Sequence, residues 1–278
     1  MSKTGRLSIS VVVVTRDRAA LLRDCLQSLS VQTRPTLETL VVDNGSSDCT
    51  AAMVKREFPQ ARLILEPGRG VHLARNRGLA EARGEIVAFI DDDCLSPPGW
   101  LEAIASCFQE PDVACAGGPT RPLWPRPPSR FLSANRRLQF CLGIVDFGAE
   151  RKRIDPDSEF LVGCNLAVRK ALVAGGFRAV QSFRSLGVCG EDYELSRRLA
   201  RQRRAFYEPA AHVFHRIQPH KMRLPYLLYR LFCFAVADAK LGGRLKPKRG
   251  PLELLSGEGA VSAVHALGHL CGRLQNSS

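Results

Sequence analysis

The N-terminal part of the chain alternates short apolar runs with segments of helical periodicity. Residues 7–15 (LSISVVVVT) contain an unbroken run of valines, which predicts a strand buried on both faces, as in a parallel sheet. Residues 18–30 repeat apolar side chains every three or four positions, which predicts a helix. We expect further strands at 39–42, 62–65, 85–90 and 113–117, and helices at 47–57, 70–82 and 100–108. This alternation predicts an α/β sheet with right-handed crossovers.

The alternation breaks after residue 117. Residues 117–128 contain five prolines, which predicts a loop or an extended connection. Beyond it we expect helices at 132–142 and 192–202 and strands at 160–168, 205–208 and 213–214. After Pro219 the pattern predicts an apolar helix at 224–241, a basic linker at 242–251 and a weaker helix at 259–274.

Charge is distributed unevenly over the 278 residues. The composition, 45% hydrophobic and 24% charged, is that of a globular protein and excludes disorder, collagen or coiled coil for most of the chain. The net charge is +13, but residues 1–120 carry −2, residues 121–153 carry +6 and residues 197–249 carry +12. A uniformly basic, histone-like protein is therefore excluded. The basic C-terminal region predicts an anionic partner, such as nucleic acid, phospholipid or a phosphorylated substrate.

Three sequence features predict a cytoplasmic protein. The N-terminus is polar and leads directly into the first strand, without the apolar region of a signal peptide. The sequence contains no run of about 18 apolar residues, so no transmembrane helix is expected. The ten cysteines form no CxxC pair, which favours reduced thiols over zinc ribbons or a disulfide framework.

Acidic side chains follow two of the predicted strands. Asp43 ends the second strand, and Asp91–Asp93 follow the apolar run of the fourth. The carboxyl ends of parallel strands share one edge of a sheet, which is where ligands of open α/β sheets bind. Three adjacent carboxylates repel one another, so we predict a divalent cation with oxygen ligands, Mg²⁺ or Mn²⁺. The alternative is a solvated turn that caps the following helix.

The sequence resembles family 2 glycosyltransferases of the GT-A fold. Five segments occur in the order and spacing of that family over about residues 7–216: SVVVVTRDRAALLRDCLQSLSVQT, ETLVVDNGSSDCT, ARNRGLAEARGEIVAFIDDD, FLVGCNLAVRKALVAGGF and GEDYELSRRLARQ. The resemblance implies a Rossmann-like, mostly parallel sheet flanked by helices, with a C-terminal helical extension. Residues 1–120 would form the donor-binding half of the GT-A domain, residues 121–218 the acceptor-binding and catalytic half, and residues 219–278 the basic extension.

The resemblance implies a set of donor-binding residues. Thr15 would contact the nucleotide base, and Asp43 would accept a hydrogen bond from a base N–H. Arg75 would face the base or the diphosphate. Asp91 would contact the ribose or the water shell of the metal, and Asp92 completes the motif. The alternatives are an Asx-turn at Asp43 and a solvated helix face for Arg75.

The resemblance also implies the metal ligands. Asp93, the last member of the DxD element, would bind a Mn²⁺ or Mg²⁺ ion that bridges the donor diphosphate and offsets charge on the leaving group. His215 would be a further ligand, with His212 as the competing position. A histidine in a strand is otherwise a partly buried hydrogen-bonding residue.

Catalytic and acceptor-binding roles follow from two further segments. In GEDYELSRR, Asp192 would be the catalytic base, and Glu191 would orient it or bind the acceptor; the alternative is that both merely begin a helix. Asn165 would orient the donor or acceptor sugar. Trp100 would stack on a sugar ring, with core packing as the alternative.

The C-terminal region predicts contact with a membrane surface. Residues 224–241 place apolar side chains near one face and basic residues at the ends, which is typical of an interfacial amphipathic helix. The alternative is a helix docked on the core. Aromatic and basic residues do not alternate in this region, so nucleic acid is not favoured as the partner.

These observations together predict an inverting, metal-dependent glycosyltransferase at the inner face of the cell membrane. It would transfer a sugar from a nucleoside diphosphate sugar to a lipid-linked or glycan acceptor, in the biosynthesis of a cell-envelope polysaccharide. The alternatives are a sugar nucleotidyltransferase of related fold and a non-catalytic module that binds membrane or nucleic acid.

Overall fold

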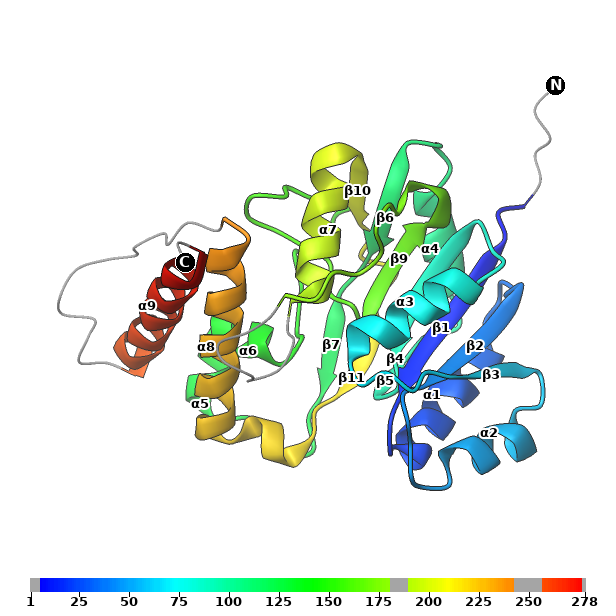
Figure 1. The fold of residues 1–278 in the computed structure, drawn as a ribbon, viewed down its shortest axis with the longest axis horizontal. Coiled ribbons are helices and arrows are strands. Elements are labelled where there is room, and N and C mark those ends of the chain that lie inside the picture. Colours follow the sequence, from blue (N-terminus) through cyan, green and yellow to red (C-terminus); the bar gives the residue numbers. More distant parts are fainter. Residues whose placement is uncertain (1–5, 181–189, 243–256, 277–278) are drawn as a thin grey trace.

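The computed structural model describes residues 6–180, 190–242 and 257–276, and an eight-stranded sheet forms its centre (Figure 1). The strand order is β3-β2-β1-β4-β9-β6-β10-β8. The strands are β1 (Ile9–Thr15), β2 (Glu38–Asp43), β3 (Ala61–Leu65), β4 (Ile86–Asp91), β6 (Val113–Gly117), β8 (Lys152–Arg153), β9 (Asn165–Arg169) and β10 (Arg204–Tyr207). Strand β9 runs antiparallel to β4 and β6, and β8 runs antiparallel to β10. The remaining pairs are parallel, as predicted.

Helices cover both faces of this sheet. The helices that bury apolar side chains against it are α1 (Ala19–Ser30), α2 (Thr50–Glu57) and α4 (Trp100–Cys107) on one face, and α3 (Val71–Glu81) and α7 (Glu191–Gln202) on the other. In β1, Val11 and Val13 pack with the first group and Val12 with the second. All three are fully buried. The valine run therefore marks a strand covered on both sides.

A second, three-stranded sheet adjoins the first. Its strands, in the order β5-β11-β7, are β5 (Cys94–Leu95), β11 (Val213–Arg216) and β7 (Thr120–Leu123). Strand β7 lies in the proline-rich stretch that was expected to be a loop or an extended connection. It is an edge strand, where a proline such as Pro122 is tolerated because its missing N–H breaks no ladder bond. Strand β11 places His215 directly opposite Cys94.

Four of the described helices form a cluster beside the sheet. They are α5 (Arg130–Ala134) and α6 (Arg136–Cys141) from the middle of the chain, and α8 (Leu224–Lys240) and α9 (Gly257–Asn276) from its C-terminal part. A 3₁₀ turn at Pro219–Met222 precedes α8, and another at Lys170–Leu172 follows β9 in the main sheet. On α8, Leu227 and Leu231 are buried against α5 and α6. Figure 1 shows α8 and α9 side by side at the end of the molecule opposite α2.

Two predicted elements differ most in extent from those observed. The helix expected at 132–142 is divided at Asn135, whose extended backbone (φ −104°, ψ 98°) ends α5 and whose side chain caps α6. The strand expected at 160–168 begins only at Asn165. Most of the expected basic linker, residues 243–251, lies outside the described residues.

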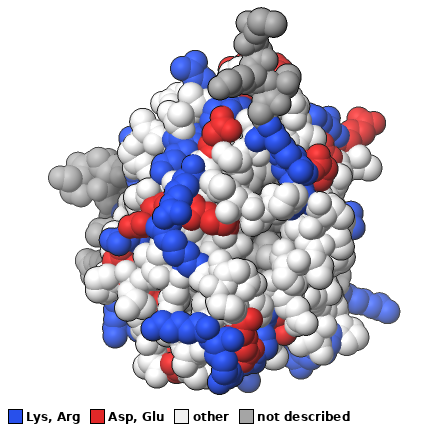
Figure 2. Space-filling model, turned by 90° about the vertical axis from the view of Figure 1, so that its right-hand side faces the viewer, with Lys and Arg blue, Asp and Glu red and all other residues white. Residues whose placement is uncertain are grey.

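One face of the molecule carries charges of both signs. Figure 2 shows the side of the molecule that lies at the right in Figure 1, where acidic and basic side chains are interspersed. This agrees with the net charge of −2 over residues 1–120. Over the residues that the structure describes, no helix is long and apolar enough to cross a membrane.

Candidate active site

A cleft of about 320 Å³ opens at the carboxyl ends of β1 and β4. Six of the predicted site residues line it: Arg75, Asp91, Asp93, Glu191, Asp192 and His215. They come from α3, the end of β4 and the turn after it, the start of α7, and β11. The fold therefore brings segments 116 positions apart in the sequence, such as those of Arg75 and Glu191, to one site.

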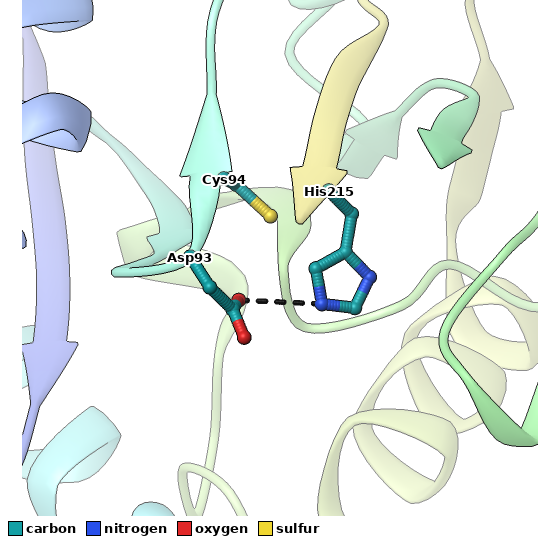
Figure 3. A group of neighbouring side chains, drawn as sticks. All are labelled: Asp93, Cys94 and His215. Carbon is teal, nitrogen blue, oxygen red and sulfur yellow. Dashed lines mark ion pairs between the residues drawn. The ribbon is translucent and has the colours of Figure 1, made fainter. Parts of the chain in front are cut away.

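Asp93, Cys94 and His215 form a buried cluster whose potential ligand atoms lie within 4.8 Å of one another (Figure 3). His215 Nε2 lies 3.3 Å from Asp93 Oδ1. Burial disfavours the charge of Asp93, but the hydrogen bond and charge of His215 outweigh it and hold the Asp93 pKa well below its usual range. Among the described atoms, His215 Nδ1 is buried without a hydrogen-bond partner. His212, the competing ligand, is not part of this cluster.

The donor set fits a divalent metal. Asp93 offers a carboxylate and His215 an imidazole, a combination better suited to Mn²⁺ than to Mg²⁺, which prefers oxygen ligands alone. Burial raises the pKa of the Cys94 thiol well above its ordinary value. Because the thiolate is the metal-binding form, Cys94 is the weakest of the three candidate ligands.

Two cations and one hydroxyl hold the neighbouring carboxylates. Arg18 Nη1 lies 3.0 Å from Asp92 Oδ1 and 3.4 Å from Asp93 Oδ2. Lys221 Nζ lies 3.4 Å from the same Asp93 oxygen. The Thr15 hydroxyl donates to Asp92 Oδ2 at 2.8 Å. Burial nevertheless raises the pKa of Asp92 to about 6.

Arg75 of α3 joins the end of β4 to α7. Its Nη1 lies 2.5 Å from Glu191 Oε1, and its Nη2 lies 2.8 Å from Asp91 Oδ1. The Arg75 side chain is buried, so the solvated helix face considered for it is wrong. Burial, and then the charge of Asp192, raise the pKa of Glu191 to about 7. A side chain at Gly163 would collide with the Arg75 guanidinium, because a Cβ there would lie 2.5 Å from Cζ.

Asp192 lies in the first turn of α7 and lines the cleft. Its Oδ2 accepts a hydrogen bond from the Gly163 N–H at 2.7 Å, and its Oδ1 accepts one from the Tyr193 N–H at 2.8 Å. Gly190, in the left-handed conformation at φ +80°, precedes the helix and turns the chain into it. These contacts hold the carboxylate at the wall of the cleft.

Asp43 ends β2 directly beside Thr15, which ends β1. Its Oδ1 accepts a hydrogen bond from the Ser46 N–H at 2.8 Å, three residues on, which is one residue further than in the Asx-turn considered as an alternative. Neither Asp43 nor Thr15 lines the 320 Å³ cleft. Both are buried at the adjoining strand ends, and their contact with a nucleotide stays a prediction.

Trp100 and Asn165 bond to each other in the core. Trp100 Nε1 donates to Asn165 Oδ1 at 2.9 Å, and Asn165 Nδ2 donates to the carbonyls of Pro119 and Ala211. Both side chains are fully buried, and neither lines the cleft. The sugar-binding roles expected for them are therefore corrected to packing, because a ring or amide enclosed in this way has no surface to offer a sugar.

Comparison with known proteins identifies the family. A family model described as glycosyl transferase family 2 matches residues 10–176. The chain belongs to glycosyl transferase family 2. Among relatives of this family 2 chain, a pre-mycofactocin glycosyltransferase of Mycobacterium tuberculosis is 28% identical over 276 residues, covering 96% of the chain and 54% of the relative. Glycosyltransferase AglE of Haloferax volcanii is 36% identical over 117 residues, covering 40% of the chain and 38% of the relative. The chain thus spans about half or less of these two relatives.

Solved structures establish the fold of this family 2 chain. The mannosyltransferase PcManGT from Pyrobaculum calidifontis, solved with GDP-Man and Mn²⁺, superimposes with a TM-score of 0.63 at 22% identity, covering 98% of this chain and 74% of that one. TarS of S. aureus, solved with UDP, gives a TM-score of 0.58 at 19% identity, covering 86% and 67%. The predicted GT-A fold is confirmed.

Sequence analysis missed several residues of the cleft. Arg18, Lys221 and the phenylalanines Phe140 and Phe234 line it but were not predicted. A partial signal existed for the cations, because Arg18 follows the end of β1 and Lys221 follows β11, the strand that carries His215. The phenylalanines come from helices whose docking no local pattern indicates.

Proposed function

We propose that the chain is an inverting, metal-dependent glycosyltransferase that moves one sugar from a nucleoside diphosphate sugar to a hydroxyl of a lipid-linked or glycan acceptor. The observation that carries this proposal is the pairing of two sites in one cleft. Asp93 and His215 offer a metal site, and Glu191 and Asp192 present carboxylates to the same space. Membership of family 2 and the fold shared with nucleotide-sugar complexes support it.

Asp192 is the proposed general base. Its carboxylate takes the proton of the acceptor hydroxyl as that oxygen bonds to the anomeric carbon, while the bond from this carbon to the diphosphate oxygen breaks. One displacement needs a single base and inverts the anomeric centre. The Gly163 N–H orients the carboxylate by donating to it at 2.7 Å.

Asp93 and His215 would hold the metal ion. When bound, such an ion offsets the negative charge that develops on the leaving diphosphate. Arg18 and Lys221, which contact Asp93 through their cationic groups, lie where they add to the same stabilisation. We propose Mn²⁺ rather than Mg²⁺ because the site offers an imidazole beside a carboxylate.

The donor would lie along the strand ends. Thr15 and Asp43 are proposed to contact the base, and Asp91 and Asp92 the ribose or the water shell of the metal. For Arg75 we propose a positioning role in place of direct contact with the diphosphate. Since its guanidinium already bonds Asp91 and Glu191, it fixes the position of both carboxylates.

The acceptor side of the cleft is apolar in part, with Phe140, Phe160, Tyr226 and Phe234 among its lining residues. A relative named glucosyl-dolichyl phosphate glucuronosyltransferase, from Haloferax volcanii, is 23% identical over 244 residues, covering 81% of the chain and 74% of the relative. This name supports a lipid-linked acceptor. It fits a peripheral contact with the inner face of the membrane, in which Leu267 and Leu270, exposed on α9, would touch lipid.

A thermal-shift screen tests the proposal. The protein is mixed with UDP-, GDP- and dTDP-sugars, with and without Mn²⁺, because a ligand that binds the native state raises the melting temperature. We expect one nucleotide series to stabilise the wild-type protein only with Mn²⁺, and Asp93→Asn to lose the effect. Stabilisation by no nucleotide sugar would contradict the proposal.

A further inference from the structure

Asp238, near the end of α8, connects three helices. Its Oδ1 accepts a hydrogen bond from the Tyr193 hydroxyl and lies 3.5 Å from Arg197 Nη1, and both of these residues are on α7. Its Oδ2 lies 2.8 Å from His269 Nε2 on α9. Figure 1 shows α8 between α9 and α7. Because a carboxylate oxygen only accepts hydrogen bonds, His269 carries its proton on Nε2 in this contact.

The position of Asp238 conflicts with the local preference of a helix. It lies two residues before the end of α8, where the helix dipole disfavours a negative charge. Residues that break a local rule need compensation from their surroundings. Here the compensation comes from Tyr193, Arg197 and His269, which together surround the carboxylate.

Tyr193 links this group to the cleft, because it directly follows Asp192 in the first turn of α7. Its ring is buried against Phe160 and Phe234, at centroid distances of 4.5 and 5.3 Å. Its hydroxyl donates to Asp238 and accepts from Arg197. Its backbone N–H donates to Asp192 Oδ1. Tyr193 therefore ties the carboxylate of Asp192 on one side to α8 on the other.

Close packing of α9 on α8 sets the distance from His269 to Asp238. A Cβ at Gly268 would lie 2.8 Å from both the Ala235 Cβ and the Phe232 carbonyl oxygen, so only glycine allows this approach. His269, the next residue, is completely buried. Gly268 thus lets α9 approach α8 closely enough for the His269 imidazole to reach the Asp238 carboxylate.

We propose that Asp238 is a positioning residue for the transfer reaction: anchored by His269 of the C-terminal helix, it holds Tyr193 and thereby fixes the first turn of α7 and Asp192. This rests on the proposed role of Asp192 as the base. The C-terminal helices then belong to the catalytic apparatus, as elements that set the orientation of the base.

Two measurements on the full chain test this proposal. Hydrogen–deuterium exchange reports on the backbone amides of α7, and kinetics with the nucleotide sugar found in the thermal-shift screen separate kcat from the donor KM. For Asp238→Asn and Tyr193→Phe we expect exchange at the start of α7 to rise about tenfold and kcat to fall about tenfold, the effect of losing one charge-assisted hydrogen bond. The donor KM should stay within about twofold, since the donor contacts are untouched.

His269 supplies the rescue experiment. His269→Ala should show the same pattern as Asp238→Asn, whereas His269→Gln keeps an N–H donor and should recover most of the kcat. The matched control is Ala266→Ser, which changes an exposed side chain of the same helix and should leave both measurements unchanged.

The outcomes separate this proposal from the proposed function. Unchanged α7 exchange in Asp238→Asn overturns the positioning role whatever the activity. An unchanged kcat with faster exchange overturns it as well, because the coupling would then have no catalytic consequence. A wild-type protein that turns over no nucleotide sugar would contradict the proposed function, while the exchange data would still decide whether α9 and α7 are coupled.

Discussion

Arg75 of α3 and Glu191 of α7 form a buried ion pair, with 2.5 Å between Nη1 and Oε1. The side chains are 5% and 7% exposed, so water screens neither charge. Arg75 also contacts Asp91 at the end of β4. One guanidinium therefore fixes the position of the end of β4 relative to α7, which carry the proposed metal site and the proposed base.

Replacing Arg75 by methionine should destabilise the fold. The change leaves Asp91 and Glu191 without their buried cation, and breaking a buried pair costs about 3–5 kcal/mol. Urea unfolding at pH 8, where Glu191 is ionised, measures the loss. Arg77→Met is the control, because Arg77 lies on the same helix but is 46% exposed in its pair with Glu81. Equal losses in the two variants would show that the buried pair has no special role.

The stability of the metal-free protein should depend on pH through Glu191. Its pKa is raised to about 7 by burial and by Asp192, so between about pH 4.5 and 7 the folded state holds a proton that the unfolded state has released. The free energy of unfolding therefore falls as pH rises through this window.

Glu191→Gln isolates that contribution, because glutamine keeps the size and does not titrate. We expect its unfolding free energy, measured in urea with EDTA, to decline less than that of the wild type between pH 5 and 7, by about 1 kcal/mol or more. Identical slopes in the two proteins would contradict the raised pKa.

The sequence predicted the sheet and most of the cleft because both depend on local patterns. The valine run predicted β1, and the three aspartates at the end of β4 predicted the cleft, each from a few neighbouring residues. The packing roles of Trp100 and Asn165 could not be predicted in this way. Their mutual hydrogen bond joins positions 65 residues apart, in a core that no local pattern describes. For Arg75, the resemblance gave its place in the cleft, but its two carboxylate partners emerge only in the folded structure.

The C-terminal region shows the same limit. Helical periodicity predicted α8 nearly to the residue, with the observed helix at Leu224–Lys240. From the sequence, this helix was expected to belong to a C-terminal extension outside the two halves of the GT-A domain. In the structure Phe234 of α8 lines the cleft, and Asp238 bonds Tyr193 of α7. An apolar face predicts that a helix will be covered, but not by which partner.

Metal binding should depend on His215 and not on His212. Because Asp93 and His215 share the buried cluster, we expect Mn²⁺ to raise the melting temperature of the wild-type protein in the absence of nucleotide, and more than Mg²⁺ does. His215→Ala should abolish the increase and His212→Ala should preserve it. If only His212→Ala lost the Mn²⁺ effect, the metal site would be assigned to His212 instead of His215.

The most direct test of the account is single-turnover sugar transfer by Asp192→Asn, beside the wild type and the control Asp157→Asn, whose side chain is 78% exposed. We predict that the Asp192 variant loses about 10²–10⁴-fold in rate, the contribution of a general base, while it binds the Mn²⁺–nucleotide complex as the wild type does. The control should transfer at the wild-type rate. Transfer by Asp192→Asn at that same rate would contradict the assignment of this cleft as the catalytic site.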